Sequence, residues 1–353
     1  MFSQTHSKEI ERLIFNYQFD QAFSYIDSNE TEIRPPTIAL YKSVLHFYHY
    51  FSVQPSKRDD IHIKKMVEAT TPITDKEDEI IASGHSEDIL MLGGCFGFQS
   101  MAEYLRKNRF AALSGASKAN ELLEELYEKD TTAVDALFGI GIYNYALSKP
   151  PKVLRFILSV VGYSGDYERG LRYLKRVAKE GIHTNIQSLL FLINHSLYDR
   201  TKYAFVYPLL TQFPEEFKTT PMYIYKKLQL EYHLGMYQEV VETFNLLDKS
   251  RTPSYVYNRS LLVRSQAYIA LNQLEPAFND LETLSFTKDR FRGGVYYDLR
   301  ETYADYYMKQ NKYKEAHSIY LMIYQNTRVD FREERVEKKL EALEQLTQGE
   351  LSY

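Results

Sequence analysis

Hydrophobic and polar residues recur along most of this chain with the three-to-four-residue period of amphipathic α-helices. The stretch from Phe110 to Tyr127, for example, places Leu113, Ala116 and Leu123 on one side and charged residues on the other. No stretch shows the strict alternation and paired turn residues that mark β-hairpins. The pattern therefore predicts an all-α protein.

Helix ends are marked by residues that favour them. Thr220-Pro221 and Thr252-Pro253 both join a capping hydroxyl to a proline suited to the first helical turn. The stretch from Phe331 to Leu346 predicts a last helix with one apolar face. The region from Ser52 to Ser83 is rich in charge and threonine, and it predicts a connection around one short helix at Ile61–Glu68.

One predicted helix, Thr131–Leu147, carries glycines at internal positions. Gly139 and Gly141 lie there on a run of small residues. A glycine inside a helix costs about 1 kcal/mol relative to alanine. We therefore expect a neighbouring helix to approach this one closely.

The C-terminal part of the chain contains three similar segments. Each follows a short polar break, ends in a small or aliphatic residue, and precedes apolar residues at helical spacing; they are residues 237–240, 274–277 and 313–316. Their last members, Val240, Ala277 and Ala316, are the positions where two helices would cross closely. The intervals exceed by a few residues the period of about 34 that is usual for tetratricopeptide repeats.

This repetition predicts an α-solenoid of stacked helix hairpins, a superhelix like that of tetratricopeptide repeat (TPR) proteins. We expect three such repeats and a C-terminal capping helix in residues 214–353. Residues 1–213 are expected to form a degenerate helical-repeat region with an inserted helix near 150–161. Solenoids of this kind bind partners on extended surfaces, so a non-catalytic protein-interaction scaffold is the expected function.

Charge, cysteine content and the N-terminal sequence limit the partners, the cysteine chemistry and the compartment that can be expected. The net charge of -4 excludes a global cationic field for nucleic acid, so no nucleic-acid partner is expected. Cys95 is the only cysteine, which excludes disulfides within the chain, and its apolar surroundings predict a buried structural thiol. No signal peptide opens the sequence as given, which predicts a cytoplasmic protein; removal of a signal peptide before Phe2 would make it periplasmic or exported.

The middle of the chain carries a second, more specific pattern. A helix with Phe138–Tyr145 ends in the paired prolines of Leu147–Leu154, and an apolar run leads to the turn Val160–Asp166 and then to Gly170-Leu171. This order resembles the tetratricopeptide-repeat 39 and inclusion-body-clearance family of eukaryotes. The chain is shorter than typical members, which favours a compact bacterial-type relative. The resemblance implies an all-helical repeat protein that binds partners, and it brings no catalytic residues.

Candidate chemistry is sparse. His46 and His49 would share one face of a helix, as a pair of metal ligands could, but no acidic residue lies in the same helix and no HExxH pattern occurs. Gly139-x-Gly141 lacks the third glycine and the preceding strand of a dinucleotide fingerprint. No nucleophile or phosphate-loop motif is present. The sequence therefore predicts no enzyme activity, no cofactor and no metal site.

A partner surface can be inferred from the repeat register. In such repeats the fifth and ninth residues of each first helix usually face the groove. If those helices begin at Pro221, Asn258 and Tyr297, the groove contains a neutral and then acidic set: Tyr225, Gln229, Gln266, Glu301 and Asp305. The two carboxylates disfavour a C-terminal carboxylate as ligand and favour a neutral or basic protein or peptide segment.

Residues 149–179 offer a different surface. They contain many basic residues and few acidic ones, and the ones of interest are Lys152, Arg155, Arg169, Arg172, Lys175 and Arg176. A basic amphipathic element of this kind can bind anionic lipid. The alternative prediction is therefore a peripheral, membrane-associated adaptor, and the competing interpretation is an inserted helix buried between repeats with a solvated basic rim.

Overall fold

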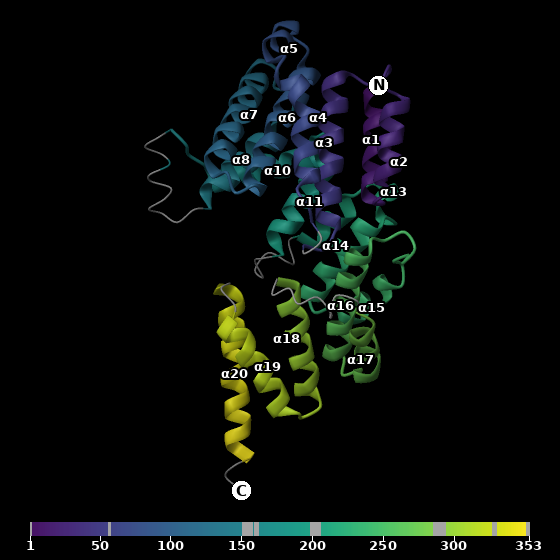
Figure 1. Cartoon of the computed structure of the whole chain (residues 1–353), viewed down its shortest axis with the longest axis vertical. Coiled ribbons are helices and arrows are strands. Elements are labelled where there is room, and N and C mark those ends of the chain that lie inside the picture. The colour runs from purple at the N-terminus through teal and green to yellow at the C-terminus, as the bar shows by residue number, and fades with distance from the viewer. Residues whose placement is uncertain are drawn as a thin grey trace. The chain divides into compact units, whose positions relative to one another are not determined.

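The computed structural model describes residues 2–55, 58–149, 158, 162–197, 206–284, 294–326 and 330–350. Every regular element within these residues is a helix, which confirms the all-α fold (Figure 1). The chain divides into two compact units, Met1–Tyr223 and Ile224–Tyr353. The repeat boundary that the sequence places near Pro214 remains a prediction.

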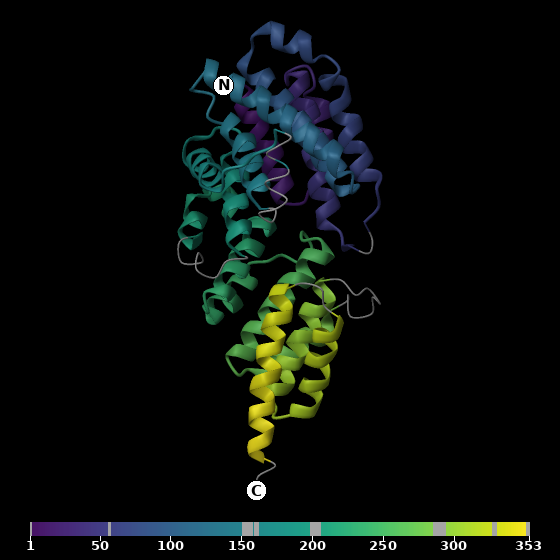
Figure 2. The same ribbon diagram turned by 90° about the vertical axis from the view of Figure 1, so that its left-hand side faces the viewer.

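Unit 1 is a series of helices in which successive described helices pack against each other, most extensively α6 with α7, α8 with α10 and α3 with α4 (Figures 1 and 2). Its helices are α1 (Phe2–Phe15), α2 (Phe19–Ser28), α3 (Pro35–Ser52), α4 (Ile61–Thr74), α5 (Glu77–Ser83), α6 (Ser86–Leu105), α7 (Arg109–Lys129), α8 (Ala136–Ser148), α10 (Tyr167–Glu180), α11 (Asn185–Ser196), the 3₁₀-helix η3 (Tyr207–Gln212) and α13 (Glu215–Lys218). The predicted inserted helix at 150–161 lies outside the described residues, apart from Leu158.

Glycines bring α8 and α10 into close contact, as the sequence predicts. A Cβ built on Gly170 would lie 2.8 Å from the carbonyl oxygen of Gly141 and 2.9 Å from the backbone nitrogen of Tyr145. A Cβ on Gly139 would lie 2.4 Å from a methyl group of Leu123 on α7. A side chain at Gly170 would meet the backbone of α8 and force the two helices apart, whereas one at Gly139 would require the Leu123 side chain to shift.

The prediction for residues 52–83 was wrong. Most of this region folds into α4 and α5 rather than into a loop around one short helix. Ile63, Met66 and Ile73 of α4 are buried, and Pro72 is accommodated near the C-terminal end of that helix. These apolar residues are separated by three and seven positions, so a helix gains a buried face that local composition does not reveal.

Unit 2 repeats a hairpin of one longer and one shorter helix before a final helix. Its helices are α14 (Pro221–His233), within which the division between the units falls, α15 (Tyr237–Phe244), α16 (Ser254–Ala270), α17 (Leu274–Thr283), α18 (Gly294–Lys309), α19 (Tyr313–Asn326) and α20 (Asp330–Glu350). The expected crossing residues Val240, Ala277 and Ala316 are fully buried, which confirms their place inside the packing.

Two helix starts in unit 2 differ from those used for the predicted groove. α14 begins at Pro221 as expected, but α16 begins at Ser254 and α18 at Gly294, not at Asn258 and Tyr297. The hydroxyl of Thr252 donates to the carbonyl oxygen of Asp248 and so holds the preceding turn instead of capping α16. The predicted groove residues of α16 and α18 therefore lie further along their helices than counted, whereas Tyr225 and Gln229 keep their positions.

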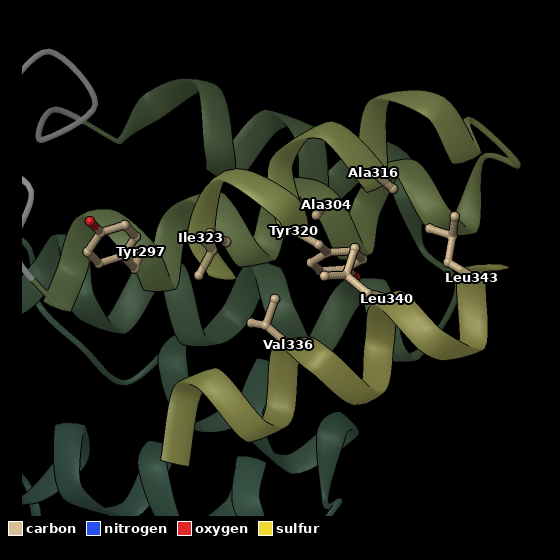
Figure 3. Close-up of a cluster of buried hydrophobic side chains, with 8 residues drawn as sticks. All are labelled: Tyr297, Ala304, Ala316, Tyr320, Ile323, Val336, Leu340 and Leu343. Atoms are coloured by element: carbon tan, nitrogen blue, oxygen red, sulfur yellow. The ribbon is translucent and has the colours of Figure 1, made fainter. Parts of the chain in front are cut away.

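The last helix completes the core of unit 2. α20 contributes Val336, Leu340 and Leu343 to a buried cluster that α18 and α19 build with Tyr297, Ala304, Ala316, Tyr320 and Ile323 (Figure 3). These side chains meet at the seam between the three helices (Figure 3). Apolar packing therefore fixes α20 along a defined face and sets the register of its polar side chains.

Candidate partner-binding surface in unit 2

A row of polar side chains connects α14, α16, α18 and α20 of unit 2, and we call it the polar row. Its members are Tyr225, Lys226 and Gln229 of α14, Arg259 and Gln266 of α16, Asp298, Glu301, Thr302 and Asp305 of α18, and Arg332, Arg335 and Lys339 of α20. All five residues of the predicted groove belong to it. The contacts below show which of them are already engaged within the chain.

At one end of the row, a chain of hydrogen bonds crosses four helices. The Arg259 guanidinium donates to the Tyr225 hydroxyl at 3.3 Å and to the Asp298 carboxylate at 2.9 Å. Arg332 donates to the other oxygen of Asp298 at 2.6 Å. Burial alone would raise the pKa of Asp298, but the two guanidinium groups outweigh it and hold that pKa below its ordinary value.

At the other end, α20 covers the two predicted carboxylates. Glu301 is buried, and it accepts hydrogen bonds from Arg335 and from the Lys339 ammonium, the latter at 2.9 Å. Lys339 also donates to both oxygens of Asp305, at 2.6 and 2.9 Å, and the Tyr320 hydroxyl donates to the same carboxylate. The expectation that these carboxylates are open to a basic ligand is therefore corrected: basic side chains of this chain already occupy them.

The neutral part of the row is half-buried. The Gln266 amide donates to the Thr302 hydroxyl at 2.9 Å, which joins α16 to α18. Gln229 accepts from the Lys226 ammonium at 3.2 Å, and that ammonium lies 5.2 Å from the centre of the Tyr225 ring. Burial, with a contribution from the Arg259 charge, lowers the pKa of Lys226 to about 8. This part of the row therefore combines the amides of Gln229 and Gln266 and the phenol of Tyr225 with the Lys226 ammonium, whose charged form burial disfavours.

The sequence analysis missed the basic members of the row, although a signal was present. Arg332, Arg335 and Lys339 are spaced by three and four residues and lie beside the apolar positions of the same helix. The polar face of α20 was expected to be a solvated cap. Arg332 is instead buried and paired with Asp298, because its helix lies against α18.

The basic segment of unit 1 is partly neutralised where the structure describes it. Arg169 forms an ion pair with Glu124 at 2.9 Å, and Arg176 forms one with Glu180 at 2.8 Å. Arg172 and Lys175 are exposed on α10, whereas Lys152 and Arg155 lie outside the described residues. Lipid binding by this segment stays a prediction.

His46 and His49, which the sequence places on one face of a helix, both lie close to a third histidine, His62. Nδ1 of His46 lies 3.2 Å from Nδ1 of His62 on α4, and the ring of His49 lies 4.2 Å from that of His62, centre to centre. Burial is the main cause that lowers the pKa of each ring, to about 4 for His46. Within the part of the chain that the structure describes, no group of three or more histidine, cysteine or acidic side chains is arranged to hold a metal ion.

Two further predictions from the sequence concern the thiol of Cys95 and membrane-spanning helices. The Cys95 side chain is fully buried, as predicted, and burial raises the pKa of its thiol to about 12. A thiol with that pKa is a poor nucleophile. None of the helices in the described ranges combines the length and the hydropathy needed to cross a bilayer.

Comparison with known proteins agrees with the repeat architecture. A family model described as Iml2/Tetratricopeptide repeat protein 39 matches residues 41–284. A search of curated proteins gave no match. The matched range includes α3 to α17, so it covers helices of both units.

Proposed function

Because the chain belongs to the Iml2/tetratricopeptide repeat protein 39 family, we propose that it is a non-catalytic scaffold that binds a protein or peptide on the polar row of unit 2. The observation that carries this proposal is the row itself, which runs across four helices and leaves Tyr225, Gln229 and Gln266 half-buried rather than fully packed. Half-buried tyrosines and amides can anchor a partner at little cost in side-chain entropy.

The chemistry of the row favours a neutral partner segment. Tyr225, Gln229 and Gln266 offer hydrogen bonds without a formal charge, and the cations beside them disfavour a basic ligand. A basic segment would reach Glu301 and Asp305 only by displacing Arg335 and Lys339. Such displacement would break the ion pairs that join α20 to α18, so we propose that Tyr225, Gln229 and Gln266 receive the partner.

The experiment begins with affinity capture of partners on the full chain, identified by mass spectrometry. The affinity of a captured partner is then measured for the wild type, for Tyr225→Ala and for Gln266→Ala. We expect Tyr225→Ala to weaken binding by roughly ten-fold or more, as an interface anchor would.

Gln238→Ala is the matched control, because Gln238 is exposed on α15, outside the polar row. It should leave the affinity unchanged. Equal affinities for wild type, Tyr225→Ala and Gln266→Ala would move the binding surface away from the polar row.

A further inference from the structure

The turn between α6 and α7 projects two aromatic side chains into solvent. Tyr104 near the end of α6 is 63% exposed, and Phe110 near the start of α7 is 89% exposed. Single exposed apolar residues are common, but a phenylalanine with almost no contact on its own chain gains nothing from folding. Two rings that flank one turn therefore call for a functional reason.

The backbone of this turn is fixed by hydrogen bonds. Lys107 adopts a left-handed conformation with φ of 66°, and the Asn108 amide nitrogen donates to the carbonyl oxygen of Glu103 at 2.9 Å. The Glu103 carboxylate accepts from Arg106 at 3.0 Å and from the Asn108 side chain at 2.8 Å. A turn closed in this way holds the bases of both rings in place.

The charge of the turn is positive. It contains Arg106, Lys107 and Arg109 against the single carboxylate of Glu103. Glu103 is paired with Arg106. Within the described ranges, neither Lys107 nor Arg109 forms an ion pair, and both are exposed. Two cations thus stand beside the two rings without a carboxylate partner.

More apolar surface lies at the same end of unit 1. Leu105 of α6 and Tyr50 of α3 both pack against a buried cluster that contains Ile63 of α4, so the C-terminal end of α6 lies near the end of α3 and the start of α4. Phe51 and Ile61, which flank the α3–α4 connection, are 38% and 50% exposed. Of the nine large apolar side chains that are exposed in the described residues, four therefore lie at this end.

A further cation accompanies the second pair. The guanidinium carbon of Arg58 lies 4.8 Å from the centre of the Phe51 ring and 5.1 Å from that of Tyr50. In the sequence, Lys57 and Arg58 are followed by Asp59 and Asp60, so the formal charges of these four residues cancel. The net positive charge of this end therefore comes from the α6–α7 turn, and the α3–α4 connection adds mainly apolar surface.

We propose that this end of unit 1 docks on the surface of a membrane that contains anionic lipid. Phe110 and Tyr104 would enter the interfacial layer, and Lys107 and Arg109 would contact headgroup phosphates. A bilayer interface surrounds a protruding ring on all sides, whereas a flat protein face covers only part of it. Aromatic rings with adjacent cations are the combination that such interfaces bind.

Co-sedimentation of the full chain with vesicles tests this proposal. One vesicle contains phosphatidylcholine alone, and the other also contains phosphatidylserine. We expect binding to the anionic vesicle, weakened roughly ten-fold by Phe110→Ser through loss of apolar burial. We expect a loss of about five-fold for each of Lys107→Gln and Arg109→Gln.

Leu246→Ser is the matched control, since Leu246 is a single apolar residue, 65% exposed, that does not belong to the proposed surface. Circular dichroism of each variant checks that folding is unchanged, as expected for exposed positions. The proposal is overturned if wild type binds neither vesicle, or if Phe110→Ser binds as wild type does. It is also overturned if Arg172→Gln with Lys175→Gln abolishes binding and Phe110→Ser does not, because α10 would then be the lipid surface.

Discussion

Arg335 of α20 donates a hydrogen bond to the buried carboxylate of Glu301 on α18, two residues that lie on different helices of unit 2. The sequence predicts that Glu301 lies in a groove open to a partner, but in the structure its carboxylate already pairs with a basic side chain of α20. Lys339 pairs with the same carboxylate, so basic side chains of α20 occupy the position that a basic ligand would take.

Removal of this pair should destabilise unit 2. Arg335→Ala leaves the buried Glu301 with Lys339 as its remaining ion-pair partner among the described residues, and we expect the free energy of unfolding to fall by about 1–3 kcal/mol. Lys338→Ala is the control, because its ion pair with Glu334 is exposed on both sides and should contribute less than about 1 kcal/mol. Urea denaturation measures both, and equal midpoints for the two variants would contradict a structural role for Arg335.

Ala316 should not tolerate a larger side chain. It is fully buried in the cluster that α20 completes (Figure 3), so Ala316→Leu must push Tyr320 or α20 out of place. We expect a loss of about 1–3 kcal/mol in unfolding free energy. Ser318→Leu, at an exposed position of the same helix, should be nearly neutral. A midpoint of Ala316→Leu that matches wild type would show that the crossing has spare room.

Gly170 and Gly97 should respond in opposite directions to the same change. Gly170→Ala places a methyl group against the backbone of α8, and we expect a loss of about 1–3 kcal/mol. A Cβ at Gly97 of α6 meets nothing within 4 Å, so Gly97→Ala should stabilise by up to about 1 kcal/mol. Thermal denaturation compares them, and a destabilisation of similar size in both variants would argue against the contact between α8 and α10.

Acid should weaken unit 1 through its histidine cluster. The pKa values of His46, His49 and His62 are lowered in the folded protein, to about 4 for His46, so the unfolded chain binds more protons below its histidine pKa of about 6.5. Stability from this cluster is therefore complete above about pH 6.5 and falls as the pH drops towards the folded values.

A variant isolates this effect from an opposing one. Burial raises the pKa of Glu11 to about 7, and that group favours the folded state as the pH falls below 7. His46→Phe keeps a ring in place but does not titrate, so the difference in unfolding free energy between wild type and variant should change between pH 7 and pH 5. A pH-independent difference would show that His46 is already solvated.

The sequence by itself determined the all-α class and most of the helices outside residues 52–83. The features that predict them are local: they are the apolar period, the helix start at Thr220-Pro221, and the small residues Ala277 and Ala316. Because each depends on residues within one or two helical turns, it can be predicted without knowledge of the tertiary structure. Gly139 and Gly141 of α8 likewise predicted that a neighbouring helix packs closely against α8. Their partner Gly170 was identified only by the packed helices.

Only the tertiary structure decided which polar groups are available. The sequence places Glu301 in a partner groove, and only the packing of α20 on α18 shows that Arg335 already pairs with it. Similarly, His62 lies beside His46 and His49 only because α4 packs on α3. The exposure of Phe110 at the turn likewise cannot be inferred from the sequence of its helix. Such pairings and exposures depend on contacts between residues distant in the chain, and periodicity carries no information about which faces those contacts cover.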